Sequence, residues 1–100
     1  MSVDLTNDIP KGAKVLGARW TLQIIYFLQE PLHFRELQEL VGGVNPTTLS
    51  QRLRFLEKKG LITRTPIASF PRRVDYHLTA MGRDLLPMLN MMGQWSQKWL

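Results

Sequence analysis

The stretch NPTTLSQRLRFLEKKG, residues 45–60, decides the fold because it marks both ends and one face of a single helix. Asn45 suits the N-cap and Pro46 the first helical position, while Gly60 suits the left-handed residue that follows a helix. Leucines recur at i, i+4 and i+7, the spacing of one helical stripe: Leu49, Leu53 and Leu56. The segment therefore predicts a helix over 46–59 that its leucines hold against a core.

The opposite face of this predicted helix carries groups that can hydrogen-bond to a specific partner. It combines hydroxyls, an amide and long cations: Thr47, Ser50, Gln51, Arg54 and Lys58. A face that only meets solvent is usually dominated by Glu and Lys. The mixture found here favours a surface that recognises something.

The net charge of +5 comes from one continuous third of the chain. Residues 46–77 hold seven basic and two acidic residues and so account for all of it, because the remainder holds six of each. A cationic excess confined to one segment is the distribution expected of a surface that binds a polyanion.

The composition fits one globular domain over 1–100. A chain of this length can remove roughly two-thirds of its surface from water, and 44% of its residues are hydrophobic. No apolar run approaches the ~18 residues of a membrane span, and the first residues lack the features of a signal peptide. We expect a cytoplasmic protein without membrane contact, with residues 1–9 loosely held.

Several classes of function are excluded or disfavoured by missing residues. The chain has no cysteine, so a disulfide, a thiol nucleophile and a thiolate metal site are all excluded. His33 and His77 are far apart in sequence, and no His, Asp and Glu cluster has metal-ligand spacing. Since no nucleophile, base and orienting group form a recognisable arrangement, we expect no enzyme, metal or cofactor.

The segments before residue 45 predict three helices, over 10–17, 18–30 and 32–41. The middle one is apolar on nearly all faces, which is typical of a buried helix. Two glycines after residue 41 supply a tight turn into the helix over 46–59. Two helices joined in this way, the second polar and basic on its free face, form a helix-turn-helix pattern.

The hydrophobic period changes after residue 60. Residues 61–65 and 72–78 read as two strands, with a loop over 66–71 between two prolines. A hairpin directly after the second helix of such a pair is the signature of a winged helix, with the wing over 62–78. The sequence thus predicts a mainly α fold with a small β-hairpin wing.

A last helix is expected over 80–99, with Thr79 as its N-cap. Pro87 lies inside it and should cause a kink or a local break. Its apolar side is larger than one small domain needs, so we expect it to pack on a second copy through Leu85, Met88, Leu89, Met92, Trp95 and Trp99.

Three quoted segments together resemble the HxlR-type branch of the MarR-like bacterial and archaeal transcription regulators. They are RWTLQIIYFL, LHFRELQELVGGVNPTTLSQRLRFLEKKGLITR and RRVDYHLTAMGRDLLPML, and the likeness runs from about Pro10 to Trp95. The resemblance implies a winged-helix homodimer that binds double-stranded operator DNA, with the helix over 46–59 in the major groove.

The chain departs from this family at one position. Many relatives carry a cysteine just before the proline that precedes the first helix, and they use it to sense electrophiles or oxidants. Here Ile9 stands before Pro10, so thiol sensing is unavailable. Any small-molecule effector stays unidentified by the sequence.

The predicted DNA contacts divide into base-edge and phosphate contacts. Gln can pair with adenine and Arg with guanine, so we expect these residues near base edges: Thr47, Thr48, Ser50, Gln51 and Arg54. Lys58 lies near the other end of the helix and should touch phosphates. Arg72 and Arg73 of the wing should meet the backbone or the narrow minor groove.

Each of these readings has an alternative. Lys58 and Lys59 could be an ordinary solvated helix end, favoured there by the helix dipole. Arg52 could form an ion pair within the fold, and Trp20 could be core or could line a ligand pocket. The whole domain could also be a protein-interaction module, because a winged helix alone does not imply DNA.

Overall fold

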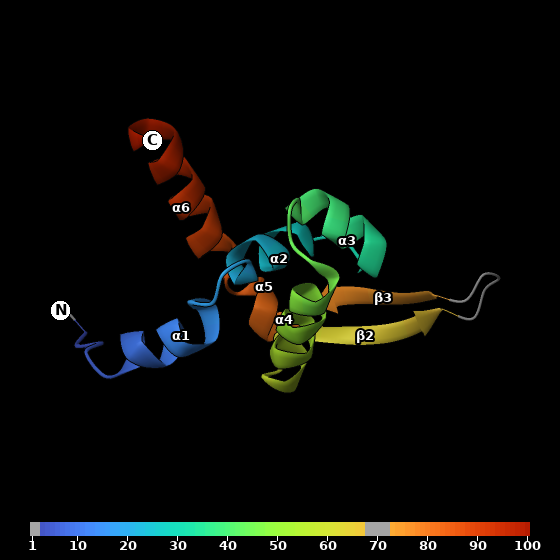
Figure 1. The fold of residues 1–100 in the computed structure, drawn as a ribbon. Helices are drawn as coiled ribbons and strands as arrows, with labels where there is room; N and C mark the ends of the chain where they lie inside the picture. The colour runs from blue at the N-terminus through green and yellow to red at the C-terminus, as the bar shows by residue number, and fades with distance from the viewer. Residues whose placement is uncertain (1–2, 68–72) are drawn as a thin grey trace.

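The computed structural model describes residues 3–67 and 73–100, which form a helical body with a small sheet (Figure 1). In chain order the elements are α1 Asp8–Leu16, α2 Thr21–Phe27, β1 Leu32–His33, α3 Phe34–Val41, α4 Pro46–Lys58, β2 Ile62–Ile67, β3 Arg73–Leu78, α5 Ala80–Arg83 and α6 Leu86–Trp99. The helix pair α3–α4 followed by the hairpin β2–β3 is the arrangement that the sequence predicts.

The leucine stripe of α4 lies at the centre of the core. Leu49 and Leu56 are fully buried and Leu53 is 2% exposed. They share one apolar cluster with residues of α2, α3, the sheet and α6: Ile24, Ile25, Leu28, Leu37, Val44, Leu61, Ile62, Leu78 and Leu89. Burying a leucine side chain contributes roughly 1.5–3 kcal/mol, so this stripe fixes which way α4 faces.

The sheet is antiparallel with the strand order β1-β3-β2. Arg64 of β2 lies opposite Tyr76 of β3, and Pro66 lies opposite Val74. The prediction placed Pro66 in a loop, but β2 continues through it to Ile67. Because β2 is an edge strand, a proline that cannot donate to a ladder is tolerated there.

The segment over 32–41 is helical only from Phe34 onward, so the prediction was wrong for its first two residues. Leu32 and His33 instead pair with Tyr76 and Asp75 of β3. His33 then caps α3: its Nδ1 accepts a hydrogen bond from the Glu36 backbone N–H, and Glu36 accepts one from the His33 backbone N–H. A histidine in a capping box is not among the residues that usually mark an N-cap, which explains the error.

Helix α2 is also shorter than the predicted span of 18–30. It begins after Trp20, whose φ of 79° is the only positive φ of a non-glycine residue in the described part of the chain. A bulky side chain rarely adopts this conformation. Trp20 is half-buried, packs against the core and lies beside the Arg19 guanidinium, 4.5 Å from the ring centroid.

The predicted last helix is divided into α5 and α6. Thr79 caps α5 as expected, with its hydroxyl accepting from the Gly82 backbone N–H at 3.2 Å. The break falls at Asp84 and Leu85, and Pro87 occupies the second position of α6, where a missing N–H is harmless. From there α6 rises away from the body, as α1 does on another side (Figure 1).

Within residues 3–67 and 73–100, no helix has both the length and the apolar character needed to cross a membrane.

Replacing Leu53 with alanine should lower the free energy of unfolding by about 2–5 kcal/mol, because it leaves a cavity beneath α4. Gln51→Ala on the exposed face of the same helix is the matched control and should change it by less than about 0.5 kcal/mol. Urea unfolding followed by circular dichroism measures both. Equal effects would contradict the burial pattern described here.

Candidate nucleic-acid interface

The side of α4 opposite the leucines is free of the core. Thr47, Gln51, Arg54 and Lys58 are all exposed and recur at i, i+4, i+7 and i+11, so they form one stripe along the outer face. One hydroxyl, one amide and two cations therefore lie side by side on this face. The stripe offers hydrogen-bond donors and acceptors along most of the length of the helix.

The start of α4 is set by its cap. Asn45 has an extended backbone, and its Oδ1 accepts from the Thr48 backbone N–H at 2.9 Å. Thr48 and Ser50 are half-buried, so they lie on the two flanks of the exposed stripe rather than within it. Of the residues predicted near base edges, these two are therefore the less accessible.

The wing contributes fewer free cations than the sequence suggests. Arg73 is exposed, but its Nε lies 3.2 Å from Oδ1 of Asp75, which offsets part of its charge. Arg72 lies outside the described residues. Arg64 was counted in the basic segment but not predicted as a contact, and the structure places its exposed side chain in hollows beside α4 and α3.

Arg52 is directed into the fold. Its Nε donates to the backbone carbonyl of Arg19 at 2.9 Å. The alternative predicted an ion pair for Arg52, and the partner is instead a neutral carbonyl within the fold. Lys59 is the C-cap residue of α4, and its Nζ lies 5.7 Å from the ring centroid of the half-buried Phe55. Neither residue belongs to the outer stripe.

Both histidines have partners within the fold. His33 caps α3, and His77 Nε2 lies 3.0 Å from the Thr63 hydroxyl and 2.8 Å from the Thr65 hydroxyl. No group of three potential metal ligands occurs among the described residues.

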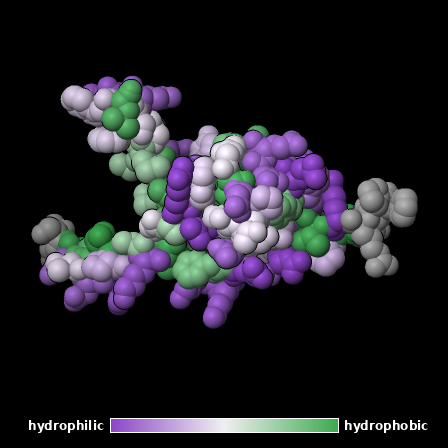
Figure 2. All heavy atoms as spheres, viewed as in Figure 1, coloured by the Kyte–Doolittle hydropathy of each residue, from purple (hydrophilic) through white to green (hydrophobic). Residues whose placement is uncertain are grey.

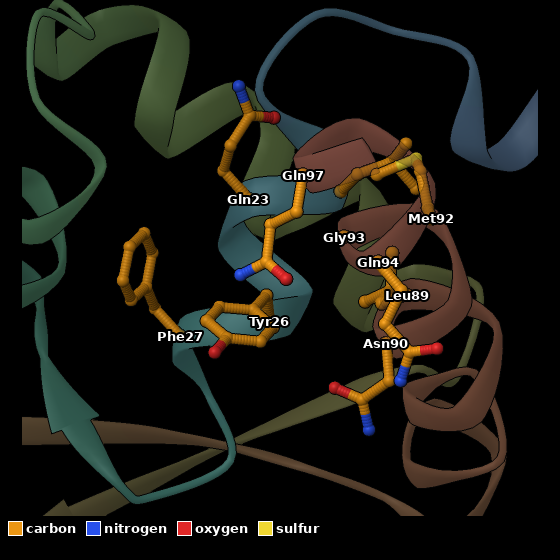
Figure 3. Close-up of a pocket in the computed structure, with 10 residues that line it drawn as sticks. Gln23, Tyr26, Phe27, Leu89, Asn90, Met92, Gly93, Gln94 and Gln97 are labelled. Carbon is orange, nitrogen blue, oxygen red and sulfur yellow. The ribbon is translucent and has the colours of Figure 1, made fainter. Parts of the chain in front are cut away.

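A separate hollow of about 740 Å³ lies between α2 and α6 (Figure 3). Its polar lining consists of amides and one phenol: Gln23, Tyr26, Asn90, Gln94 and Gln97. Tyr26 and Phe27 close one side with their rings edge to face, 5.5 Å between centroids. The hollow has no signal in the sequence, because it depends on the angle at which α6 leaves the body.

The far part of α6 exposes large apolar side chains. Met88 and Met92 are each 43% exposed, Trp95 54% and Trp99 65%. Leu89 is buried in the chain's own core and Leu85 packs against it, so these two cover their own domain. Figure 2 shows hydrophobic residues on both projecting arms, whereas hydrophilic residues gather over α3 and one end of α4.

A helix pair with a buried stripe and a free polar face, followed by an antiparallel hairpin, defines a winged helix-turn-helix protein. The chain belongs to the HxlR-like helix-turn-helix family, whose model matches residues 15–100. This family consists of transcriptional regulators of the MarR-like kind, not of enzymes. The resemblance drawn from the sequence is therefore confirmed.

Individual relatives agree with this assignment. The chain is 37% identical over 96 residues to an HTH-type transcriptional regulator of Halalkalibacterium halodurans, covering 92% of this chain and 85% of the relative. A MarR-family transcriptional regulator from Porphyromonas gingivalis W83 has a similar crystal structure, with a TM-score of 0.90, 28% identity and coverage of 100% and 99%. The reduced form of the regulator YodB from Bacillus subtilis has a TM-score of 0.80 at 27% identity, with coverage of 99% and 95%.

Truncating Arg52 should affect folding, because the hydrogen bond to Arg19 joins α4 to the start of α2. Arg52→Ala should lower the free energy of unfolding by about 1 kcal/mol. Arg54→Ala, two positions along the same helix, should change it by less than about 0.5 kcal/mol. Urea titration of both variants tests the assignment, and a larger loss at Arg54 would refute it.

Proposed function

We propose that this chain binds operator DNA as a homodimer and so regulates transcription. In each subunit, α4 enters the major groove and the wing lies on the backbone or in the minor groove. The observation that carries the proposal is the orientation of α4: its leucines are buried while Thr47, Gln51, Arg54 and Lys58 remain exposed. A helix presented in this way matches the docking geometry of helix-turn-helix proteins.

The side chains of the outer stripe have chemistry suited to reading bases. Gln51 can pair bidentately with adenine and Arg54 with guanine, each pair giving about 1–3 kcal/mol of discrimination. Thr47, Thr48 and Ser50 would add contacts near the N-terminal half of α4, and Lys58 would meet phosphate. Arg73 would contact the backbone, together with Arg72 if that residue also faces the duplex.

The alternative is a winged helix that docks on another protein. Charge separates the two functions, because a protein-docking surface does not require the cationic excess to lie in α4 and the hairpin. Binding to phosphates weakens with salt, with a log-log slope of about −0.9 for each phosphate contacted. A steep slope supports DNA binding, and an affinity insensitive to salt supports the protein-docking alternative.

The projecting helices α1 and α6 are evidence for the proposed homodimer. The radius of gyration is 14.9 Å, larger than the ~13 Å of a compact 100-residue domain. The arm α6 also leaves Met92, Trp95 and Trp99 largely exposed to water. A partner subunit that packed on these residues, and on Met88, would remove this apolar surface from solvent. We therefore propose these four residues as the dimer contacts and leave out Leu85 and Leu89, which pack in their own domain.

A small-molecule effector would be expected between α2 and α6. The hollow there has a volume within the ~300–1,000 Å³ usual for ligand sites, and its amides would suit a neutral ligand.

We expect the regulator to act in the cytoplasm, where its DNA lies.

Arg54 and the wing arginines should differ in their effect on sequence preference. Selection of bound sequences from random duplex DNA should give an inverted repeat for the unchanged protein, with recognition helices roughly 34 Å apart. Arg54→Ala should lose preference at one base pair per half-site, because one bidentate contact disappears. Arg72→Ala combined with Arg73→Ala should lower affinity evenly for all sequences, and identical behaviour of the two variants would contradict the assigned roles.

The dimer should depend on the far part of α6. Analytical ultracentrifugation should find a dimer at micromolar concentration. Met92→Asp should weaken it by burying a charge, and Trp95→Ala by removing apolar contact. Met91→Gln, at the 71%-exposed neighbour of Met92, tests whether the effect is specific to the stripe. A stable monomer of the unchanged protein would refute the proposed packing.

A further inference from the structure

Arg64 stands at the junction of the proposed reading helix and the wing. It belongs to β2, faces Tyr76 of β3 in the register, and lines two hollows. The smaller, of about 270 Å³, lies against α4 and includes Ser50, Arg54 and Glu57. The larger, of about 580 Å³, lies against the first turn of α3 and the start of β3.

The smaller hollow collects hydrogen-bond donors for which the described residues supply no acceptor. Ser50 and Tyr76 are half-buried hydroxyls, and Arg54 and Arg64 are exposed guanidiniums. None of the four forms a side-chain hydrogen bond or ion pair with another residue in 3–67 or 73–100. The four side chains are therefore free to donate together to an acceptor that enters the hollow from outside.

The charges around Arg64 favour an anion as that acceptor. Glu57 is the acidic side chain in the smaller hollow, and it faces two arginines there. Arg35 and Arg73 share the larger hollow with Arg64. Asp75 and Glu36 line neither hollow. Asp75 Oδ1 forms an ion pair with Arg73 at 3.2 Å but accepts no hydrogen bond from the described residues, and Glu36 accepts one from the His33 backbone.

We propose that the smaller hollow is a seat for a phosphate of the DNA backbone, with Arg64 as its central residue. The proposal rests on the proposed function, since the phosphate belongs to the strand that passes between α4 and the wing. Guanidinium forks match phosphate oxygens bidentately, and the hydroxyls of Ser50 and Tyr76 supply further donors. Arg54 also lines this hollow, and in the proposed function its guanidinium reads a base.

The second hollow extends this seat toward α3. Arg35 lies in the first turn of α3 and is exposed, so a neighbouring phosphate of the same strand would meet Arg35 on the far side of Arg64. The backbone would then be held by three elements at once: α3, α4 and β2. Contacts of this kind fix the register of a protein on the duplex without reading its sequence.

The test compares charge variants by the salt dependence of DNA binding. Fluorescence anisotropy of a labelled mixed-sequence duplex measures the binding constant between about 50 and 200 mM salt. In a plot of its logarithm against the logarithm of the salt concentration, Arg64→Gln should make the slope shallower by about 0.9 for each subunit whose Arg64 contacts a phosphate. For each phosphate contact that is lost, the affinity should fall roughly 3.5-fold less between these two salt concentrations than it does for the unchanged protein. Arg64→Lys keeps the charge and should restore the slope, though not the full affinity, because a lysine offers no fork.

Lys14→Gln is the matched control, since Lys14 is an exposed cation on α1 and its neutralisation should leave the slope unchanged. Thermal unfolding should be alike for all variants, because Arg64 contributes no internal hydrogen bond or ion pair among the described residues. If the unchanged protein binds DNA but Arg64→Gln behaves as Lys14→Gln does, the seat is refuted while the proposed function stands. If the unchanged protein does not bind DNA at all, both fail.

A titration with inorganic phosphate separates a DNA seat from a site for a free anion. Millimolar phosphate should leave the NMR signals of Ser50, Arg64 and Tyr76 nearly unmoved, whereas a short duplex should shift them. Saturable binding of free phosphate at these residues, without any effect of Arg64→Gln on DNA binding, would overturn the assignment to the DNA backbone.

Discussion

The burial of three leucines on one side of α4 is the constraint from which the other features follow. Leu49, Leu53 and Leu56 are each at most 2% exposed, and turning the helix by half a revolution would place them in water and bury two cations. Several kilocalories per mole oppose that rotation. The outward direction of Thr47, Gln51, Arg54 and Lys58 is therefore set by the core, which leaves their side chains exposed.

The sequence predicted α4 closely because its signals are local. An asparagine cap, a proline at the first helical position, a leucine stripe and a glycine at φ 87° after Lys59 all lie within one segment, and the structure has each of them. Thr79 as the cap of α5 and the hairpin after Gly60 were predicted for the same reason. Such signals depend on neighbours in sequence and need no knowledge of the tertiary fold.

The errors and omissions concern features that depend on distant residues. Strand β1 is only Leu32 and His33, and it exists because β3 offers its edge. The pairing of Arg73 with Asp75 and the hydrogen bond from Arg52 to Arg19 changed which cations are free. Arg64 was missed as a contact because only the register with Tyr76 and the packing of α4 beside the sheet bring it next to Ser50 and Arg54.

The polar and apolar surfaces of the molecule lie apart. The polar face of α4 and the hairpin lie on one part of the body, while the apolar arm α6 extends from another (Figures 1 and 2). Arg52 joins α4 to the segment before α2, since its Nε donates to the backbone carbonyl of Arg19, just before the strained Trp20.

The most direct measurement of the central claim is an NMR titration of the isotope-labelled protein with a short duplex that it has selected. The account predicts that the amide signals of Thr47, Gln51, Arg54 and Lys58 shift together, while those of Trp95 and Trp99 stay in place. Shifts confined to α2 and α6, or a helix α4 that remains unaffected at saturating DNA, would contradict it.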